Sequence, residues 1–183
     1  MSVSTEDQQG TRAGKEVSGL LLDAVKEAGV TLTAALPDDW VLPLLNLLDA
    51  ESSITNVHVA REPEIVTLCS GAFFGGVRSL GVLGSTGLLT CMSELCSLNI
   101  KHQVPLFLIV SLRSGVYEHQ SFQEVQSRTM LPLLETLQIP YVIIDTPAKI
   151  SLIPPAYKAS RLHKRPYIAW LTKSLLTGEQ SDF

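Results

Sequence analysis

Two acidic residues at the start of a predicted helix are the first candidates for chemistry in this chain. The stretch His58 to Gly76, HVAREPEIVTLCSGAFFGG, is typical of a strand end, a charged turn and a helix that opens on Glu62, Pro63 and Glu64. Proline suits the first helical turn, where its missing N–H group costs nothing. Carboxylates are among the groups that move protons in enzymes. Their position at the positive end of the helix dipole, however, explains both acids without any chemistry.

Three further segments carry polar or glycine residues where a strand is predicted to be followed by a helix. They are LPDDW with Asp38 and Asp39, GSTGLL with Ser85, Thr86, Gly87 and Leu88, and RSGVYEHQSFQE with Arg113, His119 and Gln123. In parallel α/β sheets, ligands bind at the carboxyl ends of the strands. These segments and AREPE could therefore converge on one crevice.

Each of these segments also has a purely structural interpretation. Asp38 and Asp39 are preferred helix-capping residues, and GSTG is a helix start of the kind that binds any anion. A histidine in a polar loop such as His119 is usually solvated. Arg113 after a buried strand can be structural, although its guanidinium fork suits a carboxylate, sulfonate or phosphonate.

Length and composition indicate one globular domain. The chain has 183 residues, of which 45% are hydrophobic and 17% charged, and a net charge of −4; this is enough for a core and gives no basic footprint for nucleic acid. The longest apolar run, Val104 to Val110, is too short to span a bilayer. The three cysteines lack CxxC spacing, which favours buried free thiols in a cytoplasmic protein and argues against a zinc site. The four histidines are dispersed, and we expect no metal ligands on this chain.

Helical and strand patterns alternate along the whole sequence. Strands are predicted around 30–36, 54–60, 79–85, 104–112, 140–145 and 166–171, and helices around 15–28, 38–51, 62–74, 86–100, 122–137 and 149–162. This alternation predicts an α/β fold with a parallel sheet of about six strands and helices on both faces. We expect a flexible N-terminal segment over 1–13, one domain over 14–175 and a C-terminal tail over 176–183.

The spacing around Glu62 resembles a known family. An acid nine residues before a Gly-small-aromatic step, here Gly71, Ala72 and Phe73, is similar to the pyrimidine-binding (PYR) domain of thiamine-diphosphate-dependent 2-oxo acid decarboxylases. The resemblance implies the PYR-type fold for residues 15 to 172. It also implies that Glu62, not Glu64, hydrogen-bonds the aminopyrimidine ring of thiamine diphosphate and promotes its imino form.

The other segments extend this resemblance toward the α subunits of sulfopyruvate and phosphonopyruvate decarboxylases. It implies proton handling by Asp39 and His119, and substrate binding by Asp38, Arg113 and Gln123. GSTGLL is similar to the family segment beside the pyrimidine ring, which makes Ser85, Thr86, Gly87 and Leu88 cofactor-binding candidates. The sequence departs from the family pattern at Leu89, Thr90, Ser93 and Glu124.

Nothing in the chain is similar to the family segment that holds Mg²⁺ and the diphosphate. The resemblance therefore implies the α subunit of a two-subunit decarboxylase for a small anionic 2-oxo acid, with thiamine diphosphate and Mg²⁺ anchored mainly by a β subunit. We expect a homodimer in isolation and an α2β2-type assembly with that partner. One alternative is a non-catalytic interaction subunit of the same fold. The other is a nucleotide-binding or flavodoxin-like module, but neither GxGxxG nor GxxxxGK[ST] is present.

Overall fold

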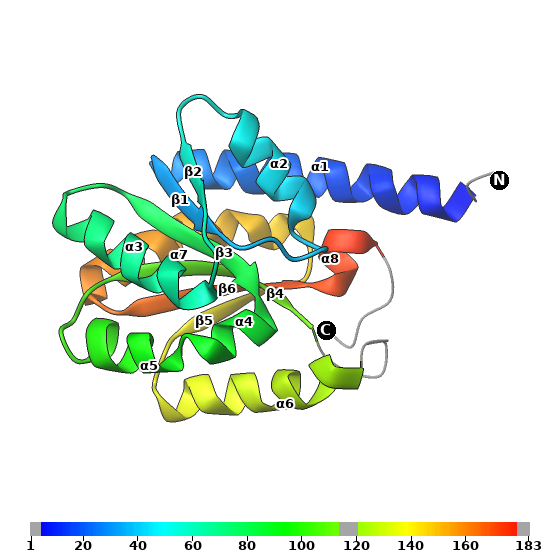
Figure 1. Ribbon diagram of the computed structural model, residues 1–183. Helices are drawn as coiled ribbons and strands as arrows, with labels where there is room; N and C mark the ends of the chain where they lie inside the picture. Colours follow the sequence, from blue (N-terminus) through cyan, green and yellow to red (C-terminus); the bar gives the residue numbers. More distant parts are fainter. Residues whose placement is uncertain (1–4, 114–120, 179–183) are drawn as a thin grey trace.

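A six-stranded sheet whose strands all run parallel lies at the centre of the molecule (Figure 1). The computed structural model describes residues 5–113 and 121–178, with side chains at 14–113, 125 and 128–178. The strand order is β2-β1-β3-β4-β6-β5. The strands are β1 Leu32–Ala35, β2 Thr55–His58, β3 Ser79–Gly84, β4 Leu106–Leu112, β5 Tyr141–Ile144 and β6 Pro166–Thr172.

Helices cover both faces of the sheet, as the alternating pattern predicted. They are α1 Thr5–Glu27, α2 Leu42–Ala50, α3 Glu62–Phe74, α4 Ser85–Thr90, α5 Met92–Glu94, the π-helix η1 Leu95–Ile100, α6 Ser121–Thr136, the 3-10 helix η2 Pro147–Leu152, α7 Ile153–His163 and α8 Lys173–Thr177. The buried side chains form two separate clusters, one beneath α1, α2 and α7 and the other beneath α3, α4 and α6. The predicted α/β architecture is therefore confirmed.

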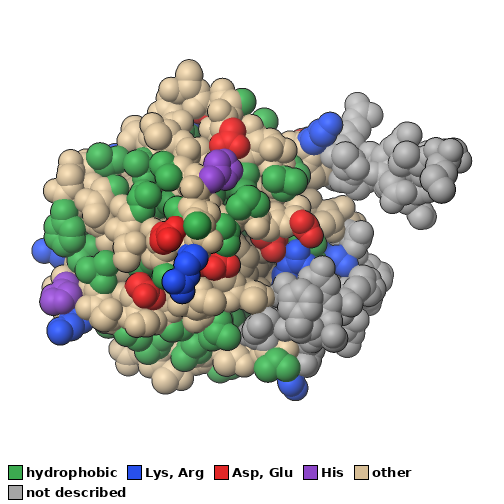
Figure 2. All heavy atoms as spheres, in the orientation of Figure 1, with side chains coloured by type: hydrophobic (Ala, Val, Ile, Leu, Met, Phe, Trp, Pro, Cys, Tyr) green, Lys and Arg blue, Asp and Glu red, His purple; other side chains and the backbone are tan. Residues whose placement is uncertain are grey.

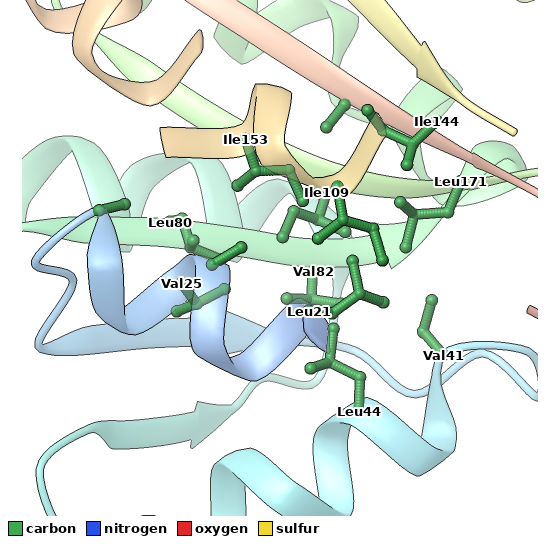
Figure 3. Close-up of a cluster of buried hydrophobic side chains, with 14 of the residues drawn as sticks. Leu21, Val25, Val41, Leu44, Leu80, Val82, Ile109, Ile144, Ile153 and Leu171 are labelled. Carbon is green, nitrogen blue, oxygen red and sulfur yellow. The ribbon is translucent and has the colours of Figure 1, made fainter. Parts of the chain in front are cut away.

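The first core lies between the sheet and α1, α2 and α7. Figure 3 shows Leu21 of α1 and Leu44 of α2 close to Val82 of β3 and Ile109 of β4. All four side chains are fully buried, and such burial stabilises the fold by roughly 1.5–3 kcal/mol for each side chain. The amphipathic spacing of α1 thus places its apolar stripe on the central strands.

The second core fixes α3 against the sheet. Gly81 of β3 allows α3 to approach closely, because a Cβ there would contact Ile65 of α3 and lie 2.6 Å from Leu108 of β4. Both β3 and β4 are buried along nearly their whole length, as expected of strands that are covered on two faces. The start of α3 is therefore held at a defined place beside the end of β3.

The chain order creates a switch point in the sheet between β1 and β3. From β1, the chain passes through α2 to β2 on one side, and then returns through α3 to β3 on the other side. Since α2 and α3 contribute to different cores, the two connections cover opposite faces. Ligands of such sheets bind at the carboxyl ends of the strands beside the switch point.

One predicted helix is broken into three pieces. Residues 86–100 were expected to form a single helix, but α4 ends at Thr90 and α5 leads into the π-helix η1. The amide of buried Asn99 donates to Ser70 Oγ (2.9 Å) and to the Val104 carbonyl (3.1 Å). Tertiary hydrogen bonds of this kind, which hold the end of the helix to α3, cannot be read from periodicity.

Two other details differ from the sequence-based expectation. The first helix begins at Thr5 rather than near Lys15, within the segment that was expected to be flexible; acids near a helix start suit the helix dipole, and Glu6 and Asp7 follow Thr5 directly. Cys69 and Cys91 are buried as predicted, but Cys96 is exposed. Among the described residues, no helix has the length and apolar character needed to cross a membrane.

Candidate functional site

The two acids at the start of α3 have different surroundings. Glu64 is exposed, and its Oε2 accepts hydrogen bonds from the backbone N–H groups of Ala60 (3.0 Å) and Arg61 (3.3 Å). It therefore caps the helix that it helps to open. Glu62 is half-buried, and none of the described residues donates a hydrogen bond to it. Of the two, Glu62 is the acid that is available for another role.

Glu62 lies directly against the first turn of α4. A Cβ at Gly87 would lie 2.7 Å from Glu62 Oε1 and 2.8 Å from its Cδ. Real Cβ atoms essentially never show contacts this short, so the position of the carboxylate depends on the missing side chain at 87. The carbonyl of Gly87 accepts hydrogen bonds from Thr90 Oγ1 (2.7 Å) and Cys91 Sγ (3.4 Å), which fix the glycine in turn.

The surroundings of this contact are largely apolar. Burial raises the pKa of the Cys91 thiol to about 12, and the nearby charge of Glu62 contributes to the rise. Leu88 is fully buried. Ser85 Oγ is also buried and has no hydrogen-bond partner among the described residues, which is unusual for a buried polar atom. The first turn of α4 thus combines a tight backbone approach with an unsatisfied hydroxyl group.

Asp38 links the carboxyl ends of three strands. Its Oδ1 accepts hydrogen bonds from the Trp40 backbone N–H and from Ser111 Oγ, both at 3.1 Å. Its Oδ2 accepts from Arg113 Nε at 3.2 Å. A Cβ at Gly84 would lie 2.9 Å from the same Oδ2. The loop after β1 is thereby tied to the ends of β3 and β4, and Asp38 does more than cap a helix.

Arg113 is held between this acid and an aromatic ring. Its guanidinium carbon lies 4.0 Å from the centre of the Trp40 ring, a distance typical of a cation–π contact, and the residue is 4% exposed. Lys173, the first residue of α8 directly after β6, places its Nζ 5.9 Å from the centre of the same ring. Trp40, Ser111 and Lys173 were not among the candidates predicted from the sequence. Lys173 directly follows a buried strand, just as Arg113 does, and this shared position could have identified it as a candidate site residue.

The remaining predicted residues form two groups, one at the carboxyl edge of the sheet and one whose side chains the structure does not describe. Asp39 is exposed and Thr86 is half-buried, both at the carboxyl edge of the sheet. His119 lies outside the described residues, and Gln123 lies in α6 with its side chain outside them. The departures from the family pattern are also spread: Leu89 is half-buried, Thr90 and Ser93 are exposed, and the side chain of Glu124 is not among those described.

The structure therefore brings together two pairs beside the switch point. Glu62 meets Gly87, and Asp38 meets Arg113, with Gly84 and Gly87 both following β3. Figure 2 shows acidic and basic side chains gathered near the centre of the face that carries α3 and α4, with hydrophobic patches around them. Within the described part of the chain, no group of three or more His, Cys, Asp and Glu side chains could hold a metal ion.

Comparison with solved structures supports the fold. The chain superposes on 2-oxoglutarate:ferredoxin oxidoreductase from Magnetococcus marinus with a TM-score of 0.67 and 15% identity. The match covers 90% of this chain and 29% of that protein. At this low identity, the likeness concerns the fold alone. No protein-family model matches the chain.

Comparison with curated sequences identifies the family. The chain is 30% identical over 150 residues to sulfopyruvate decarboxylase of Methanosarcina acetivorans, a match that covers 81% of this chain but 38% of that longer protein. It is also 30% identical over 124 residues to the sulfopyruvate decarboxylase α subunit of Methanococcus maripaludis. That match covers 68% of this chain and 74% of that subunit. These matches confirm the resemblance found in the sequence, and the chain belongs to the family of sulfopyruvate decarboxylase α subunits.

Proposed function

We propose that this chain is the pyrimidine-binding half of a two-subunit, thiamine-diphosphate-dependent decarboxylase. Its substrate would be a small anionic 2-oxo acid such as sulfopyruvate or phosphonopyruvate. The observation that carries the proposal is the placement of Glu62 on Gly87 beside the switch point of the sheet. That carboxylate has no hydrogen-bond donor among the described residues, whereas Glu64 is engaged as a helix cap.

The residues at the first turn of α4 fit the pyrimidine side of this cofactor. Gly87 gives a close backbone approach, and buried Ser85 Oγ has no partner among the described residues. Together with Glu62, Thr86 and Leu88, they would hold the aminopyrimidine ring. When bound, thiamine diphosphate supplies the carbanion and the electron sink for decarboxylation. The carboxylate of Glu62 would hydrogen-bond that ring and share a proton with it.

The second pair would serve the substrate. Asp38 would contribute to substrate binding, as the resemblance implies. It would also orient Arg113, because its carboxylate accepts a hydrogen bond from Arg113 Nε. A guanidinium group in this position suits the distal anion of the substrate, and Gln123 would assist. Exposed Asp39 and, beyond the described residues, His119 would handle protons.

The diphosphate and Mg²⁺ would be held mainly by a β subunit. A divalent cation of this kind needs oxygen ligands at defined geometry, and the described residues offer no acidic cluster for one. The match to 38% of a longer sulfopyruvate decarboxylase supports a division of the enzyme into two chains. We further propose a cytoplasmic assembly of the α2β2 type.

The alternative of a non-catalytic subunit is less well supported. It rests on the departures at Leu89, Thr90, Ser93 and Glu124. Thr90, however, still contributes to the site, because its hydroxyl group donates to the Gly87 carbonyl (2.7 Å). The named relatives are decarboxylases and their α subunits, which favours the catalytic interpretation.

Replacement of Glu62 by glutamine tests the proposed function. Glutamine keeps the shape of the side chain but cannot hold the proton as a carboxylate does, so turnover with the β subunit present should fall by roughly 10²–10⁴-fold. The matched control is Glu64→Gln, two residues away, which should retain turnover. Near-normal turnover in Glu62→Gln together with loss in Glu64→Gln would refute the assignment.

A further inference from the structure

Three neighbouring strands are each preceded by a non-glycine residue with a positive φ angle. These residues lie at the amino edge of the sheet, the edge opposite the candidate site. The residues just before β4, β5 and β6 include Gln103 (φ 54°), Gln138 (φ 53°) and Lys164 (φ 51°). All three adopt the left-handed backbone conformation without being glycine. This conformation is unfavourable for residues that carry a Cβ, so the side chains are kept there at a cost in stability.

The other side of the same edge is built differently. β1 and β3 are entered through Gly29 (φ 69°) and Gly76 (φ 76°). Glycine is the usual residue where a helix ends in the left-handed conformation. At Gly29 a Cβ would also lie 3.1 Å from Arg78 Nε, so glycine leaves space for that side chain. Before β4, β5 and β6 the same backbone conformation carries side chains instead.

Basic residues gather at this part of the edge. Leu106 of β4 pairs with Pro166 of β6, so the segments that precede the two strands lie side by side. We define the basic rim as the exposed side chains of these segments: Lys101, His102, His163, Lys164 and Arg165. None of them forms an ion pair with a described residue. Figure 2 shows a histidine between side chains of the Lys and Arg colour at the left margin of the molecule, the side on which β4 and β6 begin in Figure 1.

Local helix electrostatics do not fully account for the basic rim. A cation in the last turn of α7, such as His163 when protonated, suits the negative end of the helix dipole. Lys164 and Arg165 lie beyond that turn, and they add positive charge to this part of the surface. The chain as a whole carries a net charge of −4, so the rim differs in sign from the protein's overall charge. Apolar side chains are also exposed beside them, with Leu162 at 75% and Ile100 at 37% exposure.

We propose that the basic rim docks an acidic segment of another polypeptide. The cations would pair with its carboxylates, Gln103 would bond to its polar groups, and Leu162 would receive an apolar side chain. The exposed apolar side chains of Leu162 and Ile100 beside the cations fit a polypeptide better than a phosphate backbone, whose contacts are cationic or polar. Because the rim lies at the opposite edge from Glu62 and Arg113, docking there leaves the candidate site accessible.

A peptide-binding measurement on the full chain tests this proposal. The probe is a fluorescein-labelled peptide of glutamate, leucine and glycine, and binding is followed by fluorescence anisotropy at low and at moderate salt. The test variant combines Lys164→Gly, which suits the backbone at that position, with Arg165→Gln. We expect this variant to raise the Kd by about tenfold or more, and added salt to weaken wild-type binding.

The control variant combines Lys15→Gln with Lys149→Gln, which removes the same charge from other exposed places and should leave the Kd unchanged. Lys101→Gln provides a second rim variant in case the first unfolds. Equal binding by rim and control variants, or no binding by the wild type, would overturn the proposal. So would tighter rim-dependent binding of a single-stranded oligonucleotide or of anionic lipid vesicles than of the peptide.

Discussion

Gly87 helps to set the position of the acid beside it, because a larger residue would displace the Glu62 side chain. A Cβ at position 87 would lie 2.7 Å from Glu62 Oε1. Gly87→Ala should therefore displace the carboxylate and lower turnover by at least about tenfold, in line with the sensitivity of catalysis to small misplacements. The measurement is turnover with the β subunit present, alongside thermal unfolding of the isolated chain.

Gly71→Ala is the control for this substitution. Gly71 lies in α3, and a Cβ there would meet nothing within 4 Å. Alanine is favoured over glycine inside a helix by up to about 1 kcal/mol, so this variant should keep its activity and unfold at the same or a higher temperature. Full activity in Gly87→Ala would show that Glu62 does not need its present position.

Arg113 should decide how strongly the enzyme prefers a substrate with a second negative group. Lysine keeps the charge, but it cannot donate through Nε to Asp38 and stack on Trp40 at the same time. We expect Arg113→Lys to raise the KM for sulfopyruvate about tenfold more than the KM for pyruvate, a difference of about 1.4 kcal/mol. Steady-state kinetics with the two substrates measure this directly. An equal change for both substrates would remove Arg113 from the substrate site.

The sequence led to some of these residues and not to others for a physical reason. Glu62, Ser85 and Gly87 belong to short motifs, so local spacing was enough to single them out as candidates. The bond between Asp38 and Arg113 joins residues 75 positions apart, and its existence depends on β1 and β4 lying on either side of β3. Lys173 was missed because a single lysine after a strand has no motif around it.

At the scale of elements, an exposed ion pair joins the ends of α1 and α2. Glu51, the C-cap residue of α2, accepts a hydrogen bond from Lys26 Nζ at 2.6 Å and further bonds from Ser53. The bond from Lys26 is the main cause that lowers the pKa of Glu51 from 4.5 to about 2. A carboxyl group whose pKa is depressed on folding stabilises the native state above its unfolded pKa.

This pair should give stability a defined pH dependence. The contribution of Glu51 should be fully present above pH 4.5 and be lost as the pH falls toward 2. Glu51→Gln should therefore unfold at a lower temperature than the wild type at neutral pH, and the two should converge near pH 2. High salt should reduce the difference at neutral pH, because the pair is exposed. A difference that does not change with pH would contradict the ion-pair explanation.

Most elements could be predicted from the sequence because their patterns are local. The continuous apolar run of β4 and the amphipathic stripe of α1 each reflect burial against the sheet, and burial leaves a periodic trace. The break after Thr90 and the π-helix η1 were not predicted, because apolar spacing does not reveal tertiary hydrogen bonds such as those from Asn99 to Ser70 and Val104. The early start of α1 at Thr5 was missed because the prediction used only the apolar stripe.

At the scale of the whole molecule, the parallel sheet places the candidate site and the basic rim at opposite edges. The carboxyl edge gathers Glu62, Asp38 and Arg113 from loops that follow β2, β1 and β4. The amino edge carries the basic rim. Because the strands are all parallel, a partner at one edge need not compete with a ligand at the other. This arrangement allows a regulatory or assembly contact without any change to the candidate site.

The isolated chain should fold but remain inactive. Helices on both faces of the sheet contribute buried residues to its two cores, and its 183 residues are enough for a stable domain. The proposed division of the enzyme places the anchor of the diphosphate on the β subunit. Since a ligand binds weakly when most of its contacts are missing, we expect weak binding of thiamine diphosphate and no decarboxylation by this chain alone.

Titration calorimetry with Mg²⁺ and thiamine diphosphate measures this binding, first on the isolated chain and then after addition of the β subunit. Binding should tighten by orders of magnitude when both chains are present, and decarboxylation should appear at the same point. Glu62→Gln serves as the control, because it should form the same assembly but lack turnover. If this chain alone binds the cofactor tightly and turns over its substrate, it is a whole enzyme and the division into two halves is wrong.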